Sequence, residues 1–106
     1  MSPTNALEFI YRVMALCREL ERFGPSVTRW GSTDLHTKAV EGFSGDPHTW
    51  FCGADLAWDH QPDTASLNTA AARYGLKALV EKDHTHTQPA DWPAGPVTVA
   101  PHWWHA

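Results

Sequence analysis

The chain has 106 residues, and 8 Lys and Arg against 12 Asp and Glu give it a formal charge of −4 with His counted as neutral. This length fits one domain, and 42% hydrophobic residues are enough for a core and too many for a disordered chain. The acidic balance argues against binding to nucleic acid, and charged residues interrupt every long apolar run, which argues against membrane insertion. Seven His and six Trp are the unusual part of the composition, and His is the commonest metal ligand.

The N-terminal segment predicts a long amphipathic helix. Asn5 can cap its first turn, and Glu8 three residues later completes a capping box. Gly24 and Pro25 end the helix, because Gly accepts the left-handed conformation that follows a helix and Pro cannot continue one. Apolar side chains at helical spacing predict the buried face, which consists of Leu7, Ile10, Met14, Cys17 and then Leu20 or Glu21.

The remaining elements follow in short succession, separated by Gly and Pro. We expect a strand at residues 27–30, a short helix at 35–41, a buried strand at 50–58, a helix at 62–74, and strands at 76–80 and 84–88. This order predicts a single α+β domain. From residue 89 onward the chain contains four Pro and has no helical period. We therefore expect an extended tail that either packs on the domain or contacts a partner or another copy.

Two His-containing stretches carry candidate chemistry. His48 precedes the strand predicted at residues 50–58, and Asp55 lies within it. His84 and His86 alternate on a later strand, so their side chains point to the same face. If the two strands are neighbours, His48, Asp55 and one of these His side chains can converge. Two His and one carboxylate leave one position of a tetrahedral Zn²⁺ open for water, which is the form of a catalytic zinc site.

The acidic residues near the His pair allow more than one interpretation. Either Glu81 or Asp83 can serve as a general base for a metal-bound water, and either can instead be a turn residue. His48 and Asp55 can likewise be a loop His and a turn carboxylate. Cys52 lies four residues after His48, so a Cys-His nucleophile pair is a further alternative.

The spacing of these residues matches a known pattern. Ser44 stands shortly before His48, six residues follow, and Asp55 closes the motif. Downstream, a sequence of the form Asp-His-x-His-x-Gln begins at Asp83. In this order of motifs, residues 16–88 resemble the M15 family of zinc D,D- and L,D-peptidases, whose fold is shared with the Hedgehog signalling domain.

The resemblance implies a fold and a metal site. It implies a small domain at residues 1–88, with an antiparallel sheet flanked by helices, followed by the tail at residues 89–106. It also implies that Zn²⁺ is the cofactor and that its ligands are His48, Asp55 and His86.

The resemblance also implies roles in catalysis and substrate binding. Asp83 matches the family's catalytic acidic residue, because it lies three residues before the last ligand. Glu81 is the alternative, since it lies three residues before His84. His84 then contacts the metal ligands or the transition state. The candidates for substrate contacts are Arg29 and Ser44.

The activity that the resemblance implies is hydrolysis of amide bonds in peptidoglycan stem peptides, as in phage endolysins, with endopeptidase and carboxypeptidase action both open. No basic region precedes an apolar segment at the N-terminus, so we predict no secretory signal. We expect a protein that acts on the cell wall from the cytoplasm of the producing cell or from a virion. Phe51 replaces a Gly of the family pattern, and Ser32 replaces an Arg that holds a substrate carboxylate. These departures favour the alternative of a non-catalytic phage or prophage structural component or zinc-binding module.

Overall fold

The computed structural model describes residues 5–31 and 52–92. In chain order, these residues form α1 (Ala6–Glu19), a 3₁₀ turn (Glu21–Phe23), β1 (Pro25–Trp30), β2 (Ala54–Trp58), α3 (Thr64–Arg73), β3 (Leu76–Val80) and β4 (Thr85–Pro89). The strands form one sheet in the order β1-β2-β4-β3, and each neighbouring pair is antiparallel. The prediction of a small α+β domain with an antiparallel sheet is therefore confirmed.

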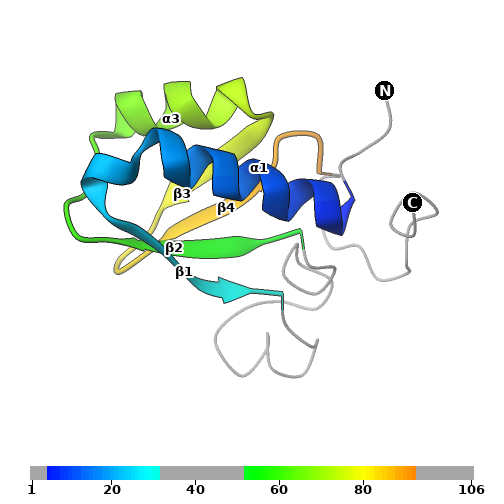
Figure 1. The fold of residues 1–106 in the computed structure, drawn as a ribbon, viewed down its shortest axis with the longest axis horizontal. Coiled ribbons are helices and arrows are strands. Elements are labelled where there is room, and N and C mark those ends of the chain that lie inside the picture. The colour runs from blue at the N-terminus through cyan, green and yellow to red at the C-terminus, as the bar shows by residue number, and fades with distance from the viewer. Residues whose placement is uncertain (1–4, 32–51, 93–106) are drawn as a thin grey trace.

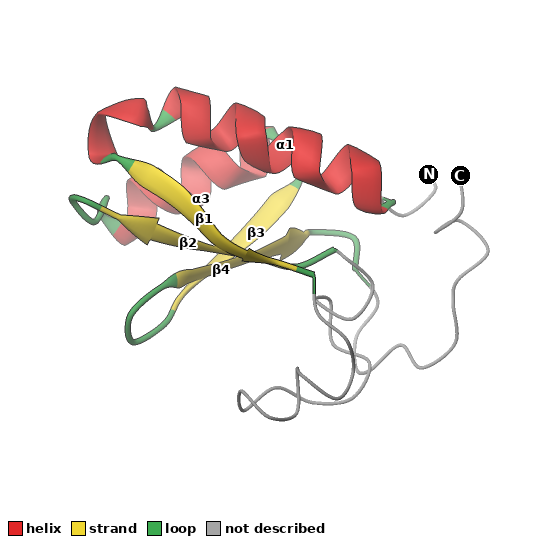
Figure 2. Ribbon diagram, turned by 60° about the horizontal axis from the view of Figure 1, so that its bottom comes forward, coloured by secondary structure: helices red, strands yellow, loops and turns green. Residues whose placement is uncertain are grey.

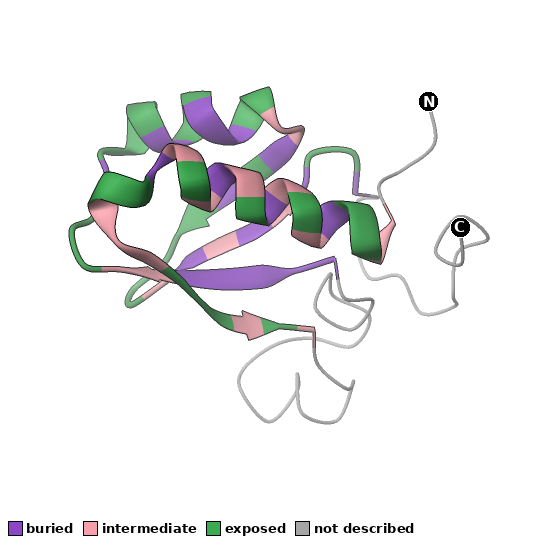
Figure 3. Cartoon of the chain, in the orientation of Figure 1, coloured by how far each residue is buried: buried purple, intermediate pink, exposed green. Residues whose placement is uncertain are grey.

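The two helices lie together on one face of the sheet (Figures 1 and 2). The buried residues lie along β2, at alternate positions of β3 and β4, and at intervals along both helices (Figure 3). The core contains Phe9, Val13, Leu16, Leu20, Cys52, Ala54, Leu56, Leu67, Ala70, Ala71, Leu76, Ala78 and Trp92. Because the helices cover only one face, the opposite face of the sheet is where polar side chains of the strands can gather.

The first helix begins as predicted and ends earlier. The Asn5 side chain accepts a hydrogen bond of 2.9 Å from the backbone N–H of Glu8, so the predicted cap is confirmed. The α-helix ends at Glu19, and the 3₁₀ turn carries the chain to Gly24, whose φ is 62°. A Cβ at Gly24 would lie 2.3 Å from Oδ2 of Asp59, so both the backbone conformation and the lack of space require Gly there.

The predicted buried face of α1 is confirmed at Leu20 and wrong at Leu7 and Met14. The residues with no or almost no exposure are Phe9, Val13, Leu16 and Leu20, whereas Leu7 is 61% exposed and Met14 54% exposed. Two sets of apolar residues on this helix satisfy helical spacing, and the set that includes Phe9 packs on the sheet. Ile10 and Cys17 lie at the edge between the two sets and are partly buried against the core.

The later elements match the predictions to within a few residues. Asp63 caps α3 by accepting a 2.9 Å hydrogen bond from the N–H of Ser66, and β3 has its predicted bounds. β1 begins two residues earlier than predicted, and β2 begins at Ala54, so Cys52 precedes the strand. The predicted helix at residues 35–41 lies outside the described residues.

The start of the predicted tail packs on the domain. β4 extends to Pro89, and Trp92 is 9% exposed and belongs to the core. The N–H of Ala90 donates a hydrogen bond to the carbonyl of Gly75. The rest of the tail, residues 93–106, lies outside the described residues. In the part of the chain that the structure describes, we find no helix with the length and apolarity needed to cross a membrane.

Candidate functional site

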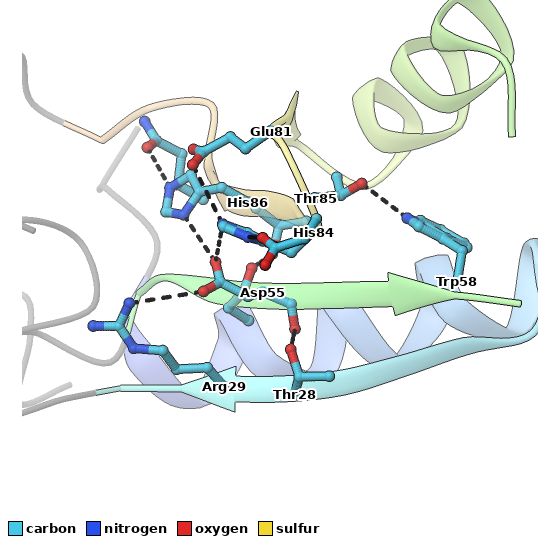
Figure 4. A network of polar contacts seen from close by, with 12 residues as sticks. Thr28, Arg29, Asp55, Trp58, Glu81, His84, Thr85 and His86 are labelled. Atoms are coloured by element: carbon cyan, nitrogen blue, oxygen red, sulfur yellow. Dashed lines mark hydrogen bonds and ion pairs between the residues drawn. The ribbon is translucent and has the colours of Figure 1, made fainter. Parts of the chain in front are cut away.

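A cluster of His and acidic residues lies on the face of the sheet opposite the helices. β2 and β4 are neighbours, and Asp55 pairs directly with His86 across them. Ala54 and Leu56, on either side of Asp55, belong to the core beneath the helices. Because side chains alternate along a strand, Asp55 and His86 point to the other face. His84 lies two residues before His86 and reaches the same carboxylate (Figure 4).

Asp55 is the centre of this cluster. Its Oδ1 atom lies 3.4 Å from Nδ1 of His86 and 3.8 Å from Nε2 of His84. The Asp55 side chain is 9% exposed, and that of His86 is 12% exposed. The condition that the sequence left open, that the two strands are neighbours, is thus met. A nearly buried carboxylate requires charged or hydrogen-bonding neighbours, and Arg29 and His84 lie beside it.

Arg29 reaches the same carboxylate from β1. Its Nη1 atom lies 3.7 Å from Oδ2 of Asp55. The register of β1 against β2 shifts between Val27 and Arg29, so that Thr28 is an additional residue on β1. The Thr28 hydroxyl donates a 3.3 Å hydrogen bond to the backbone carbonyl of Asp55. The structure therefore places Arg29, a predicted substrate contact, against a predicted metal ligand.

His84 lies between several carboxylates. Its Nδ1 is 2.7 Å from Oδ1 of Asp83, and its Nε2 is 3.3 Å from Oε2 of Glu81. The hydrogen bond to Asp83 raises the pKa of His84, and the charges of Asp55 and Glu81 raise it further against the opposing effect of burial. The same hydrogen bond lowers the pKa of Asp83.

The two candidate bases differ in position. Glu81 contacts the ring nitrogen of His84 that also faces Asp55, and its side chain is 50% exposed. Asp83 contacts the other ring nitrogen, and its side chain is 84% exposed. Figure 4 shows the Glu81 carboxylate directed toward the ring of His84.

Gln88 is a further residue of the cluster, and it was not among the predicted site residues. Oε1 of Gln88 lies 2.9 Å from Nε2 of His86. In the tautomer that carries its proton on Nε2, His86 donates this hydrogen bond, since a carbonyl oxygen only accepts. In neutral His86 the lone pair of Nδ1 then faces Oδ1 of Asp55. The signal was present in the sequence, because two residues further along a strand is the nearest position on the same face.

Cys52 does not have the environment of a nucleophile. It is fully buried, and burial, with a smaller contribution from the charge of Asp91, raises the pKa of the Cys52 thiol to about 12. A catalytic Cys requires a thiolate, which a low pKa provides. The environment therefore argues against the Cys-His alternative.

The described residues supply part of the predicted metal site. Asp55 and His86 are adjacent, whereas His48 and Ser44 lie outside the described residues. Within residues 5–31 and 52–92, no group of three or more His, Cys, Asp or Glu side chains is arranged to hold a metal ion. No protein-family model, curated protein or solved structure matches this chain.

Proposed function

We propose that this protein is a zinc-dependent peptidase that hydrolyses amide bonds in peptidoglycan stem peptides. The observation that carries the proposal is the contact between Oδ1 of Asp55 and Nδ1 of His86. Both atoms are acceptors when His86 is neutral and its Nε2–H is donated to Gln88. The two atoms lie 3.4 Å apart, so a metal ion can take both as ligands when Nδ1 carries no proton.

The donor set and the spacing fit zinc. Zinc takes imidazole nitrogen and carboxylate oxygen at roughly 2.0–2.2 Å, so two ligands of a tetrahedral ion lie roughly 3.3–3.6 Å apart. The distance between Asp55 and His86 is 3.4 Å. Asp55 and His86 would hold the ion together with the predicted ligand His48. Bound there, zinc would supply an acidified water and a polarised carbonyl group.

The neighbouring side chains suit proton transfer beside such a site. Glu81 is half exposed and lies 3.3 Å from His84, so it can take a proton from a reacting group and pass it on. Asp83 keeps its negative charge, because its hydrogen bond to His84 lowers its pKa. The raised pKa of His84 favours an imidazolium, which can stabilise an oxyanion. We propose Glu81 as the base ahead of Asp83, with His84 as the contact to the transition state.

The substrate class comes from the resemblance of the motifs to M15 peptidases. It implies a protein that acts on the cell wall, from the producing cell or from a virion. Arg29 contacts Asp55, and the family's substrate-anchoring Arg is Ser32 in this chain. These two observations support a second candidate, a zinc-binding module that has the metal site and does not turn over substrate.

Metal analysis tests the zinc site. We expect one Zn²⁺ per chain by inductively coupled plasma mass spectrometry, and loss of most of it in Asp55→Ala, His86→Ala and His48→Ala. His60→Ala is the matched control, because His60 is exposed and lies outside the cluster. Wild-type protein without bound zinc, after refolding with the metal, would contradict the proposal.

Digestion of purified sacculi tests the activity and the base. We expect the wild-type protein to release new amino groups detectable by mass spectrometry, Glu81→Gln to lose this release, and Asp83→Asn to retain more of it. The reverse order of the two variants would make Asp83 the base. Zinc-loaded wild-type protein that releases nothing would favour the non-catalytic module.

A further inference from the structure

We propose that Arg29 is a positioning residue for Asp55. A β-bulge turns its guanidinium onto Oδ2, and this contact directs Oδ1 toward His86. Without the bulge, residues 27 and 29 would point to the same face, because side chains repeat every two residues along a strand. Val27 pairs with Leu56, a core residue beneath the helices, whereas Arg29 pairs with Asp55 on the opposite face. The extra residue, Thr28, changes the face to which Arg29 points, as β-bulges do.

The two oxygens of Asp55 have different surroundings. Oδ2 lies 3.7 Å from the Arg29 guanidinium, and Oδ1 faces the two imidazoles (Figure 4). The Arg29 side chain is 24% exposed and that of Asp55 9% exposed, so water screens this ion pair less than one at the surface. The Thr28 hydroxyl, through its bond to the Asp55 carbonyl, ties the bulge to the backbone of the same residue.

The consequence for metal binding rests on the proposed function. A carboxylate whose second oxygen is held by a cation presents a single oxygen in a fixed direction. Groups that hold a ligand in this way usually contribute about 10–100-fold to metal affinity. A positive charge near the site would also repel Zn²⁺, so positioning and repulsion predict opposite effects when the charge is removed.

The first experiment needs no metal. NMR on the metal-free protein can measure the three-bond couplings between the carboxyl carbon of Asp55 and its backbone nitrogen and carbonyl carbon. These couplings report the rotamer about the χ1 bond of Asp55. We expect one rotamer in the wild-type protein and averaged couplings in Arg29→Gln, with an intermediate result in Arg29→Lys. Ser26→Ala, at an exposed position on β1, is the matched control and should match the wild type. Equal couplings in wild-type protein and Arg29→Gln would overturn the positioning role.

The second experiment measures zinc affinity by competition with a chromophoric chelator. We expect Arg29→Gln to bind zinc about 10–100-fold more weakly and Arg29→Lys to recover part of the loss. Unchanged or tighter binding in Arg29→Gln would overturn the proposal, because Arg29 would then act only as a repelling charge. A wild-type protein that binds no zinc, and whose Asp55 loosens in Arg29→Gln, would support the positioning role and contradict the proposed function.

Discussion

The amide of Gln88 contacts the nitrogen of His86 that does not face Asp55. Its Oε1 atom lies 2.9 Å from Nε2 of His86. We predict that Gln88→Ala weakens zinc binding by about 10–100-fold, since groups that orient a ligating His usually contribute that much. Gln88→Glu keeps an acceptor at the same place and should retain affinity close to that of the wild type. Chelator competition measures both, with Lys77→Ala, the cross-strand neighbour on β3, as control. Wild-type affinity in Gln88→Ala would show that Nε2 needs no fixed acceptor.

Glu19 links α1 to the end of α3 and should make stability depend on pH. It accepts hydrogen bonds from Arg73 at 3.1 and 2.7 Å and from the Tyr74 hydroxyl at 3.0 Å. The bond to Arg73 is the main cause of its lowered pKa. A carboxyl whose pKa is lower in the folded state stabilises the protein above its unfolded pKa, and this contribution is lost as pH falls through the folded value.

We predict that Glu19→Gln lowers the midpoint of thermal unfolding at pH 7 and that the difference from the wild type disappears in acid. The loss should begin near the ordinary Glu value of 4.5 and be complete below the lowered folded value. Circular dichroism melts from pH 7 to pH 2.5 measure it, with Glu21→Gln as control. A difference that is the same at every pH would show that the Glu19 contacts do not depend on its charge.

At the scale of elements, α1 shows that helical periodicity alone does not predict which side chains are buried. Helical spacing identified α1 and its cap at Asn5, because both are local properties. Helical spacing also placed Leu7 and Met14 on the buried face, and both are exposed, because apolar residues on this helix cover more than the stripe that the sheet can bury. Phe9 and Leu16 are fully buried, while Tyr11 is 62% exposed. Which stripe packs depends on the sheet, and the sheet lies outside the window that defines the helix.

The two faces of α1 predict very different effects of truncation. Phe9→Ala should lower the free energy of unfolding by about 3–5 kcal/mol, because it leaves a cavity in the core. Met14→Ala, at a side chain that is 54% exposed, should change it by about 0.5 kcal/mol or less. Urea titration followed by fluorescence measures both. Comparable losses in the two variants would mean that another surface covers the exposed stripe.

At the scale of the whole molecule, the sequence predicted the α+β class and all four described strands, with differences at their ends. It also predicted that Asp55 would converge with His48 and one of the two later His side chains if their strands were neighbours. β2 and β4 are paired, and Asp55 lies beside both His84 and His86, while His48 lies outside the described residues. It did not predict the contact of Arg29 with Asp55, because a bulge changes the face to which a side chain points and leaves no signal in the alternation. Gln88 was not predicted because its contact is with Nε2 of His86, and the sequence does not give the orientation of that ring.

The strand order predicts which strands of the sheet unfold locally and which unfold only with the whole domain. β4, the last described strand along the chain, lies between β2 and β3, so the Asp55–His86 pair is enclosed by strands on both sides. We predict that amide protons of β2 and β4 exchange with solvent only through global unfolding, whereas those of the edge strands β1 and β3 exchange through smaller openings. Native-state hydrogen exchange in low urea measures this. If the exchange rate of the His86 amide proton does not depend on urea, that proton exchanges through a local opening, and the prediction is wrong.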